Sequence, residues 1–247
     1  MNPLITSNDC FVKNTCKKFL NPEKECECRD NDVFCIKLFK LNELYNLSML
    51  TDKQRCRIAL RIDADGTDRE EFTYLSSVER DIKKFVASGN NLYIYSTNVG
   101  NGKTTWAIRL IQSYLNSIWY TCNIECKALF VSVPRYLLAI KDSISNANEY
   151  ADQVKQGIYK ADLVIFDDIA TKSATQYEHE VLFNLIDARI NDGKCNVFTS
   201  NLNYDGLTNA VGERIASRIF NTSLSVELKG KDKRALGVTP WSFKRKL

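Results

Sequence analysis

The sequence contains no run of apolar residues that approaches the roughly 20 residues needed to cross a bilayer. Its first ten residues, MNPLITSNDC, hold no basic stretch followed by an apolar core, so we expect no secretory signal. Neither end carries a lipidation motif, and no internal repeat or low-complexity segment is present. These absences argue against a membrane or secreted protein, and we expect a cytoplasmic one.

Histidine is also nearly absent, since His179 is the only one in 247 residues, whereas cysteine occurs nine times. Stable disulfides are disfavoured in the cytoplasm, so the clustering of five cysteines near the N-terminus points to a metal site instead. Structural zinc takes four thiolate or imidazole ligands, and four of these five would have to serve. The alternative is a set of reduced or buried thiols. The five residues are Cys10, Cys16, Cys26, Cys28 and Cys35.

The length of the chain is sufficient for one sizeable α/β core and a small extra domain. Apolar residues make up 44% and charged residues 26%, which are ordinary values for a globular protein. Residues 1–78 are cysteine-rich and then polar and charged, and we predict that they form a small domain with a linker. Residues 79–247 are predicted to form the larger domain.

From residue 92 onward, short apolar runs alternate with amphipathic segments of helical period. Such alternation predicts a mostly parallel, doubly wound sheet with helices on both faces. Pro134 can open a helix at its first position. The expected strands are 92–95, 128–133, 163–166, 196–199 and 224–228, and the expected helices are 73–88, 103–115, 178–191 and 207–220.

Residues 97–104, TNVGNGKT, lie between an expected strand and an expected helix and match the P-loop pattern except at its first glycine. Thr97 stands at that position, so we expect an altered loop entry with the phosphate cradle retained. Lys103 would reach the β- and γ-phosphates of ATP, and the Thr104 hydroxyl would bind Mg²⁺. The alternative is a chance glycine turn. The expected nucleotide-binding residues of this loop are Gly100, Asn101, Gly102, Lys103, Thr104 and Thr105.

A second part of the expected site is an apolar strand that ends in two acids, Asp167 and Asp168. Buried strands rarely end in adjacent carboxylates without a cation or other partner, because burying charge is costly. We expect Asp167 to hold Mg²⁺ and Asp168 to orient and deprotonate the attacking water. Two acids that cap the next turn are the alternative. Many related sites use a longer Glu in the second role, so the shorter Asp168 predicts slow hydrolysis.

The strand expected at 196–199 ends in polar residues at the edge of the sheet where ligands bind. Asn201 is the predicted sensor of the γ-phosphate or its water, with Thr199 and Ser200 as alternatives. The alternative is an ordinary turn, in which Thr-Ser-Asn is common.

Arg214 and Arg218 are four residues apart, so they share one face of an expected helix. An arginine offered by a neighbouring subunit can neutralise charge in the transition state of ATP hydrolysis. The alternative is a pair of surface arginines.

The residues from about 91 to 236 resemble the bacterial and phage helicase loaders of the DnaC/DnaI type, which are AAA+ ATPases. The resemblance implies a P-loop core without a lid domain, Arg218 as arginine finger, and Arg234 as a second sensor that contacts the nucleotide. It also implies a homo-oligomeric ring or spiral, single-stranded DNA binding, and a DnaB-type helicase partner held by an N-terminal domain that can bind zinc. The motifs that carry it are NLYIYSTNVGNGKTTWA, ALFVSVPRYLLAIK, LVIFDDIA, NVFTSNL, GERIASRI and LKGKDKR.

The function expected from this resemblance is ATP-dependent loading of a replicative helicase onto single-stranded DNA, with ATP, Mg²⁺ and zinc as cofactors. Hydrolysis is expected to be slow and stimulated by DNA or by assembly. Two alternatives stay open, namely an AAA+ ATPase that regulates a transposase or recombinase, and a P-loop kinase for a small substrate. No acceptor-binding motif for the kinase is evident in the sequence.

Overall fold

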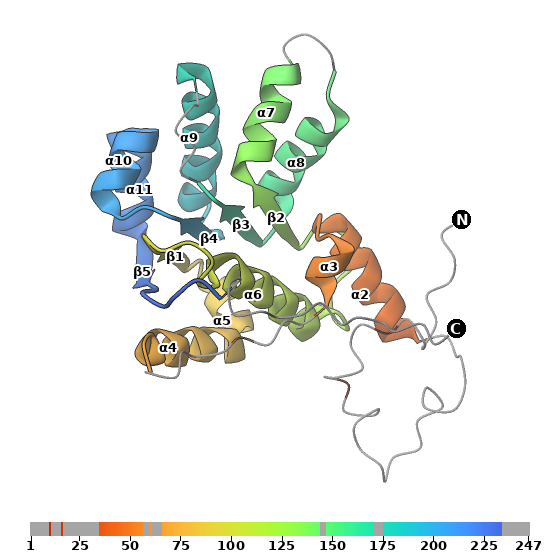
Figure 1. Ribbon diagram of the computed structural model, residues 1–247. Coiled ribbons are helices and arrows are strands. Elements are labelled where there is room, and N and C mark those ends of the chain that lie inside the picture. The colour runs from red at the N-terminus through yellow and green to blue at the C-terminus, as the bar shows by residue number, and fades with distance from the viewer. Residues whose placement is uncertain are drawn as a thin grey trace, which may run out of the picture.

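One five-stranded parallel sheet forms the centre of the protein (Figure 1). Its strand order is β2-β3-β4-β1-β5, which confirms the parallel sheet predicted from the sequence. The strands are β1 (Asn91–Tyr95), β2 (Ala128–Ser132), β3 (Leu163–Asp167), β4 (Cys195–Ser200) and β5 (Ser223–Glu227). This computed structural model describes residues 10, 16, 35–56, 60, 66–143, 147–169 and 175–233.

Helices cover both faces of the sheet, as a doubly wound fold requires (Figure 1). One face carries α2 (Ile36–Leu47), α3 (Asp52–Arg55), α4 (Arg69–Arg80), α5 (Ile82–Ala87) and α6 (Lys103–Ile118). The other carries α7 (Val133–Ser143), α8 (Glu149–Lys160), α9 (Gln176–Asn191), α10 (Tyr204–Val211) and α11 (Glu213–Thr222). The described helices offer no candidate for a membrane span.

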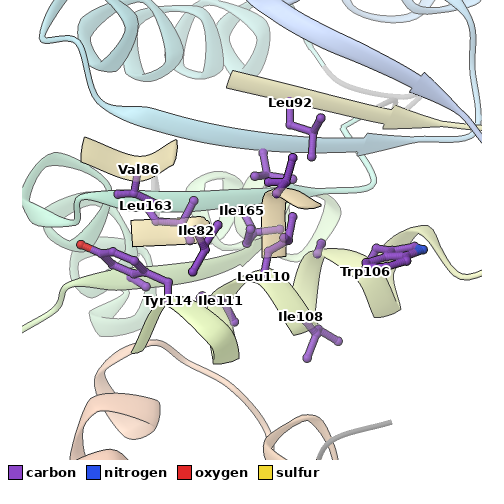
Figure 2. Close-up of a cluster of buried hydrophobic side chains, with 14 of the residues drawn as sticks. Ile82, Val86, Leu92, Trp106, Ile108, Leu110, Ile111, Tyr114, Leu163 and Ile165 are labelled. Atoms are coloured by element: carbon purple, nitrogen blue, oxygen red, sulfur yellow. The ribbon is translucent and has the colours of Figure 1, made fainter. Parts of the chain in front are cut away.

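The strands β1 to β4 are mostly apolar because each contributes to a core on both faces, whereas the edge strand β5 buries only Val226. In β3, Leu163 and Ile165 join one hydrophobic cluster, whereas Val164 and Phe166 join the opposite one. This is the two-residue alternation of a strand between two helical layers. Figure 2 shows the first cluster, in which Leu110 of α6 lies beside the β3 side chains. Burial of this apolar surface, at roughly 25 cal/mol per Å², is the main force that fixes α6 under the sheet.

Two helices predicted as continuous are broken, and those predictions were wrong. The segment predicted as a helix over 73–88 is α4 followed by α5, with Asp81 between them at φ −102° and ψ 23°. The segment predicted over 207–220 is α10 followed by α11, and Gly212 between them has φ +86°, which favours glycine. Helix α7 begins at Val133, so Pro134 is its second residue. Helix α8 was not predicted.

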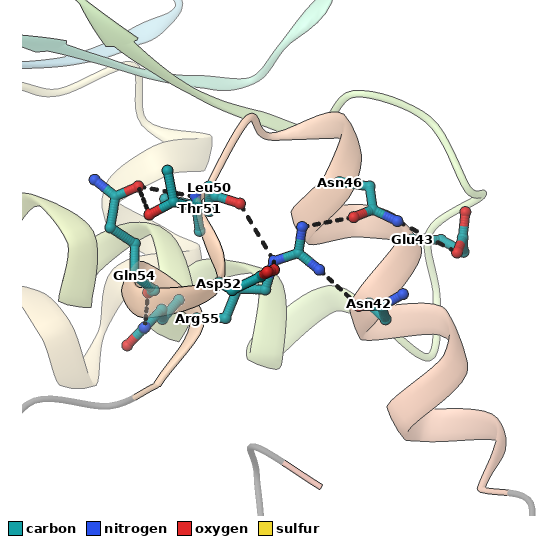
Figure 3. A network of polar contacts seen from close by, with 9 residues as sticks. Asn42, Glu43, Asn46, Leu50, Thr51, Asp52, Gln54 and Arg55 are labelled. Atoms are coloured by element: carbon teal, nitrogen blue, oxygen red, sulfur yellow. Dashed lines mark hydrogen bonds and ion pairs between the residues drawn. The ribbon is translucent and has the colours of Figure 1, made fainter. Parts of the chain in front are cut away.

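The described part of the N-terminal region packs on the same core as the rest of the chain. Leu41 and Leu44 of α2 belong to the cluster that also holds the α6 side chains. Arg55 ties α3 to α2, because its guanidinium donates to Asn42 Oδ1 at 2.8 Å and Asn46 Oδ1 at 2.6 Å (Figure 3). The division of the chain at residue 78 stays a prediction.

Arg189 of α9 connects the starting ends of β3 and β4 and has a structural role. It is fully buried, and its guanidinium donates to Asn196 Oδ1 and to the carbonyls of Ile158, Ala161 and Cys195. Burial lowers the pKa of Arg189 to about 10, so the group stays protonated at neutral pH. These contacts lie at the end of the sheet opposite to the one where the predicted site residues gather.

Candidate functional site

The predicted site residues gather where β1, β3 and β4 end. These three strands are neighbours in the order β3-β4-β1, and parallel pairing brings their carboxyl ends to one edge of the sheet. The P-loop follows β1, Asp167 is the last residue of β3, and Asp168 comes directly after it. Thr199 and Ser200 are the last two residues of β4, the strand that lies between β3 and β1. In open α/β sheets ligands bind at this edge, so the topology itself assembles the parts of the candidate site.

The P-loop has the curled backbone that a phosphate cradle needs. Gly100 and Gly102 have φ of +73° and +106°, and Gly102 is the N-cap of the sixteen-residue helix α6. The first turn of α6 therefore offers backbone N–H groups and the positive end of the helix dipole to an anion. The ammonium group of Lys103 donates to the Asn98 carbonyl at 3.0 Å and to Asn101 Oδ1 at 3.3 Å. The loop thus fits the triphosphate of a nucleotide.

The oxygen atoms that Mg²⁺ prefers meet beside the start of α6. Asp167 Oδ1 accepts hydrogen bonds from the Thr104 hydroxyl at 2.8 Å and from the Thr199 hydroxyl at 2.7 Å. Burial raises the pKa of the Asp167 carboxyl, while these two hydrogen bonds and the charge of Lys103 oppose the rise. A partly buried carboxylate beside a threonine hydroxyl fits a hard divalent cation. The hydrogen bond from Thr104 to Asp167 joins the P-loop helix α6 to β3.

Asp168 has an uncommon backbone conformation that β4 holds in place. Its φ is +56°, in the left-handed region that side chains other than glycine rarely adopt. The backbone N–H of Asp168 donates to Thr199 Oγ1 at 3.0 Å, and the N–H of Ile169 donates to the Thr199 carbonyl at 3.0 Å. Asp168 is exposed directly after β3.

Thr199 contacts both acids, and the sequence had suggested it only as an alternative to Asn201. Thr199 is 2% exposed, whereas Asn201 lies beyond the end of β4 and is exposed. The signal that could have singled out Thr199 is its place as the next-to-last residue of β4, the strand directly beside β3.

The two arginines of α11 are both held against α9 of their own chain. Arg218 Nη2 lies 2.6 Å from Asp187 Oδ1, and the Arg214 guanidinium lies 4.3 Å from the centre of the Phe183 ring. The Arg218 side chain remains 44% exposed, so part of it is accessible to another molecule. Thr105 is partly exposed in the first turn of α6. Arg234 lies outside the described residues.

A segment that we call the strap, residues 228–233, follows β5 and lies against the P-loop. Asn101 Nδ2 donates to the Leu228 carbonyl at 2.9 Å, and Asn98 Nδ2 donates to the Lys229 carbonyl at 2.9 Å. The backbone N–H of Lys233 donates to the Gly100 carbonyl at 3.0 Å. A Cβ atom at Gly100 would overlap the Asp232 carboxylate of the strap, so that side chain would have to move, and the φ of +73° also favours glycine here.

The cysteines are only partly within the described residues. Cys10, Cys16 and Cys35 are each partly exposed, and Cys10 packs against the hydrophobic cluster around α6. Cys26 and Cys28 lie outside the described residues. Among the residues that the structure describes, no group of three or more His, Cys, Asp or Glu side chains could hold a metal ion. The zinc site therefore stays a prediction.

Comparison with known proteins places these features in a family. A family model for the bacterial DnaA ATPase domain matches residues 71–227. The replicative helicase loader DnaC of Escherichia coli strain K12 is 23% identical over 161 residues, which are 64% of this chain and 60% of that protein. A crystal structure of the DnaC helicase loader superimposes with a TM-score of 0.53 at 14% identity, covering 75% of this chain and 98% of that one.

A structure of the replication initiator DnaA bound to AMPPCP and single-stranded DNA is also similar. It superimposes with a TM-score of 0.52 at 18% identity, covering 69% of this chain and 49% of that one. Both superpositions identify the AAA+ fold of DnaC and DnaA in this chain. Together with the match to DnaC, they confirm the resemblance to the loaders noted from the sequence. The chain spans 60% of the length of the E. coli loader.

Proposed function

Because the chain belongs to the family of the bacterial DnaA ATPase domain, we propose that it loads a replicative, DnaB-type helicase onto single-stranded DNA at the expense of ATP. The observation that carries this proposal is the contact of Thr104 and Thr199 with Asp167 beside a P-loop, in a chain similar to a DnaC loader. This contact joins a loop fit for phosphates to a carboxylate fit for Mg²⁺, which is the minimum that an ATP-driven loader needs.

Each residue of the site has a role in this proposal. Lys103 and the backbone of the P-loop bind the phosphates, while Thr104 and Asp167 hold Mg²⁺. Asp168 orients water and accepts its proton, and Thr199 fixes the geometry of both acids. Bound Mg²⁺-ATP supplies the reactive phosphoanhydride and the charge that neutralises its oxygens. Hydrolysis is slow and is stimulated by DNA or by assembly.

We assign the arginine finger to Arg218, acting on the ATP of a neighbouring copy. Support comes from its position on α11, where 44% of the side chain is exposed although Asp187 holds one end of the guanidinium. A contact of this kind is head-to-tail, so repetition builds a ring or an open spiral. A spiral of copies can follow the backbone of single-stranded DNA.

The remaining assignments concern the two ends of the chain. We propose that residues 1–78 bind the helicase, with zinc held by four of Cys10, Cys16, Cys26, Cys28 and Cys35. The ATPase domain comprises residues 79–247, in which Arg234 acts as the second sensor and Asn201 assists Thr199. The protein works in the cytoplasm, where the helicase and its DNA are found.

Co-purification with a candidate replicative helicase tests the proposal. The tagged chain and the helicase are mixed with ATP and passed over an affinity column and then a sizing column. We expect a stable complex that elutes ahead of either protein. ATP turnover that is stimulated by single-stranded DNA would further separate a loader from a small-substrate kinase. Binding to a transposase but not to any ring helicase would favour the recombination alternative.

A further inference from the structure

Asp68 is a buried carboxylate with two backbone partners from the strap. The residue is 6% exposed, and its two oxygens accept the N–H groups of Lys229 and Gly230, each at 2.7 Å. A buried carboxylate is costly unless hydrogen bonds satisfy it, and bonds to an ionised acceptor are among the strongest in proteins. Asp68 also has φ of +64°, so its backbone is held in a conformation that it would rarely adopt alone. Asp68 therefore holds the strap backbone at Lys229 and Gly230 in a fixed position.

The strap is also tied to helix α4, which begins directly after Asp68. The ammonium group of Lys233 lies 4.8 Å from the centre of the Phe72 ring of α4. This cation–π contact and the Asp68 hydrogen bonds hold the two ends of the strap on the same support. Phe72 itself is buried and packs edge-on against Trp106 of α6, at 5.2 Å between ring centres. The support is therefore part of the hydrophobic core.

The opposite side of the strap binds the P-loop. Asn98 and Asn101 donate side-chain hydrogen bonds to strap carbonyls, and the Gly100 carbonyl accepts one from the strap backbone. The same two asparagines hold Lys103, whose ammonium group donates to the Asn98 carbonyl and to Asn101 Oδ1. A continuous path of contacts thus runs from the Asp68 carboxylate through the strap and the asparagines to the lysine of the phosphate site.

We propose that Asp68 is a positioning residue of the nucleotide site. Its carboxylate fixes the strap, and the strap holds the P-loop and Lys103 in the shape that receives phosphates. The loop needs this external support because Thr97 replaces the glycine at its entry. The proposal deepens the proposed function and rests on it, since the P-loop must bind nucleotide for Asp68 to matter. Asp68 affects nucleotide binding and not the chemical step, because it acts only through the strap.

The substitution Asp68→Asn tests this role, because it keeps the size of the side chain but replaces one acceptor oxygen with a donor. We expect the Kd for a fluorescent ADP analogue to rise about tenfold, as the loss of hydrogen bonds to a charged group implies. The kcat for ATP at saturation should change much less than the KM. The measurement uses the full chain, at a temperature well below the unfolding midpoint of each variant.

Arg189→Met is the matched control, since it removes another buried charge with several backbone partners at the far end of the sheet. It should lower the unfolding midpoint without raising the nucleotide Kd. Asn98→Ala removes one of the links between strap and loop, namely the hydrogen bond from Asn98 Nδ2 to the Lys229 carbonyl. The Kd of the double variant should rise by less than the product of the two single increases. Such non-additivity is expected when two residues act through one connection.

Three results would overturn the proposal: an unchanged Kd in folded Asp68→Asn, a rise matched by Arg189→Met, or independent effects of Asp68→Asn and Asn98→Ala. If Asp68→Asn does not fold, Asn98→Ala alone decides, because Asn98 is exposed and its loss spares the core. An unchanged Kd in that variant would also overturn the proposal. Failure of the proposed function would look different. The wild-type chain would then bind no nucleotide, just as the Lys103→Ala variant is expected to bind none.

Discussion

Thr199 donates its hydroxyl hydrogen to the carboxylate of Asp167 across 2.7 Å, and this bond joins the ends of two neighbouring strands. The same hydroxyl oxygen accepts the backbone N–H of Asp168 at 3.0 Å. One side chain therefore sets the position of the proposed Mg²⁺ ligand and of the proposed water-orienting acid. The proposed ATPase chemistry depends on this junction as much as on the P-loop.

The substitution Thr199→Val keeps the shape of the side chain and removes the hydroxyl. We expect it to lower the kcat for ATP hydrolysis about tenfold or more, because both acids lose a fixed partner. Asn201→Ala should have a smaller effect, since Asn201 is exposed beyond β4. Steady-state ATP hydrolysis with single-stranded DNA present compares the two. A larger loss in Asn201→Ala would return the sensor role to Asn201.

Lys103→Ala should abolish nucleotide binding or turnover, because it removes the only positive side chain within residues 97–104. Equilibrium titration with a fluorescent nucleotide and an assay of phosphate release measure the two effects. Lys83→Ala, on the surface of α5, is a matched control that removes an exposed lysine and should leave both unchanged. Unaltered affinity and turnover in Lys103→Ala would contradict the assignment of this loop.

Asp168→Asn and Asp167→Asn should separate catalysis from metal binding. Asp168→Asn is expected to bind ATP with Mg²⁺ about as well as the wild type and to hydrolyse it poorly, since Asp167 remains. Asp167→Asn should weaken the Mg²⁺ dependence of binding itself. Nucleotide titrations with and without Mg²⁺, followed by single-turnover hydrolysis, measure both. Full turnover in Asp168→Asn would show that Asp168 is not the general base.

Hydrolysis should be a property of adjacent copies. Lys103→Ala and Arg218→Ala are each expected to be inactive, and a mixture of the two should regain part of the activity. Some interfaces in the mixture combine an intact Lys103 with an intact Arg218 from the neighbour. Arg214→Ala is the matched control, and it should stay active without any partner variant, because it keeps both Lys103 and Arg218. If the two inactive variants assemble together without regaining activity, Arg218 acts within its own chain.

Zinc should be present at about one ion per chain. Elemental analysis of the purified protein measures it, and the double substitution Cys26→Ser with Cys28→Ser should remove it. Cys56→Ser is the control, because Cys56 is exposed and belongs to no cysteine cluster in the sequence. Zinc at the same level in the double variant, or no zinc in a folded wild-type chain, would leave the cysteines as free thiols.

The sequence was sufficient to predict most of the sheet because the strands β1 to β4 are buried on both faces and so appear as short apolar runs. The strand predicted at 163–166 is β3 to within one residue, and its two acids lie where parallel topology requires. The helix breaks at Asp81 and Gly212 were missed, because the apolar spacing continues across both. Only the backbone conformation separates the paired helices there.

The strap and its contact with Asp68 could not be predicted, because they depend on residues far apart in the chain. Asp68 lies in a run of charged residues that resembles a solvated surface, yet its carboxylate is buried against Lys229 and Gly230. No local pattern indicates a partner about 160 residues away, as the separations of these two bonds show. The prominence of Thr199 has the same origin, since it follows from the pairing of β3 with β4.

The most direct test of the central claim measures how much replicative helicase becomes bound to circular single-stranded DNA. A closed circle offers no end to thread, so a ring helicase must be opened before it can encircle the strand. The account predicts that the chain with ATP raises the amount of helicase bound to the circle, and that Lys103→Ala abolishes the increase. An equal amount of bound helicase with and without the chain, in a mixture where the two proteins form a complex, would contradict it.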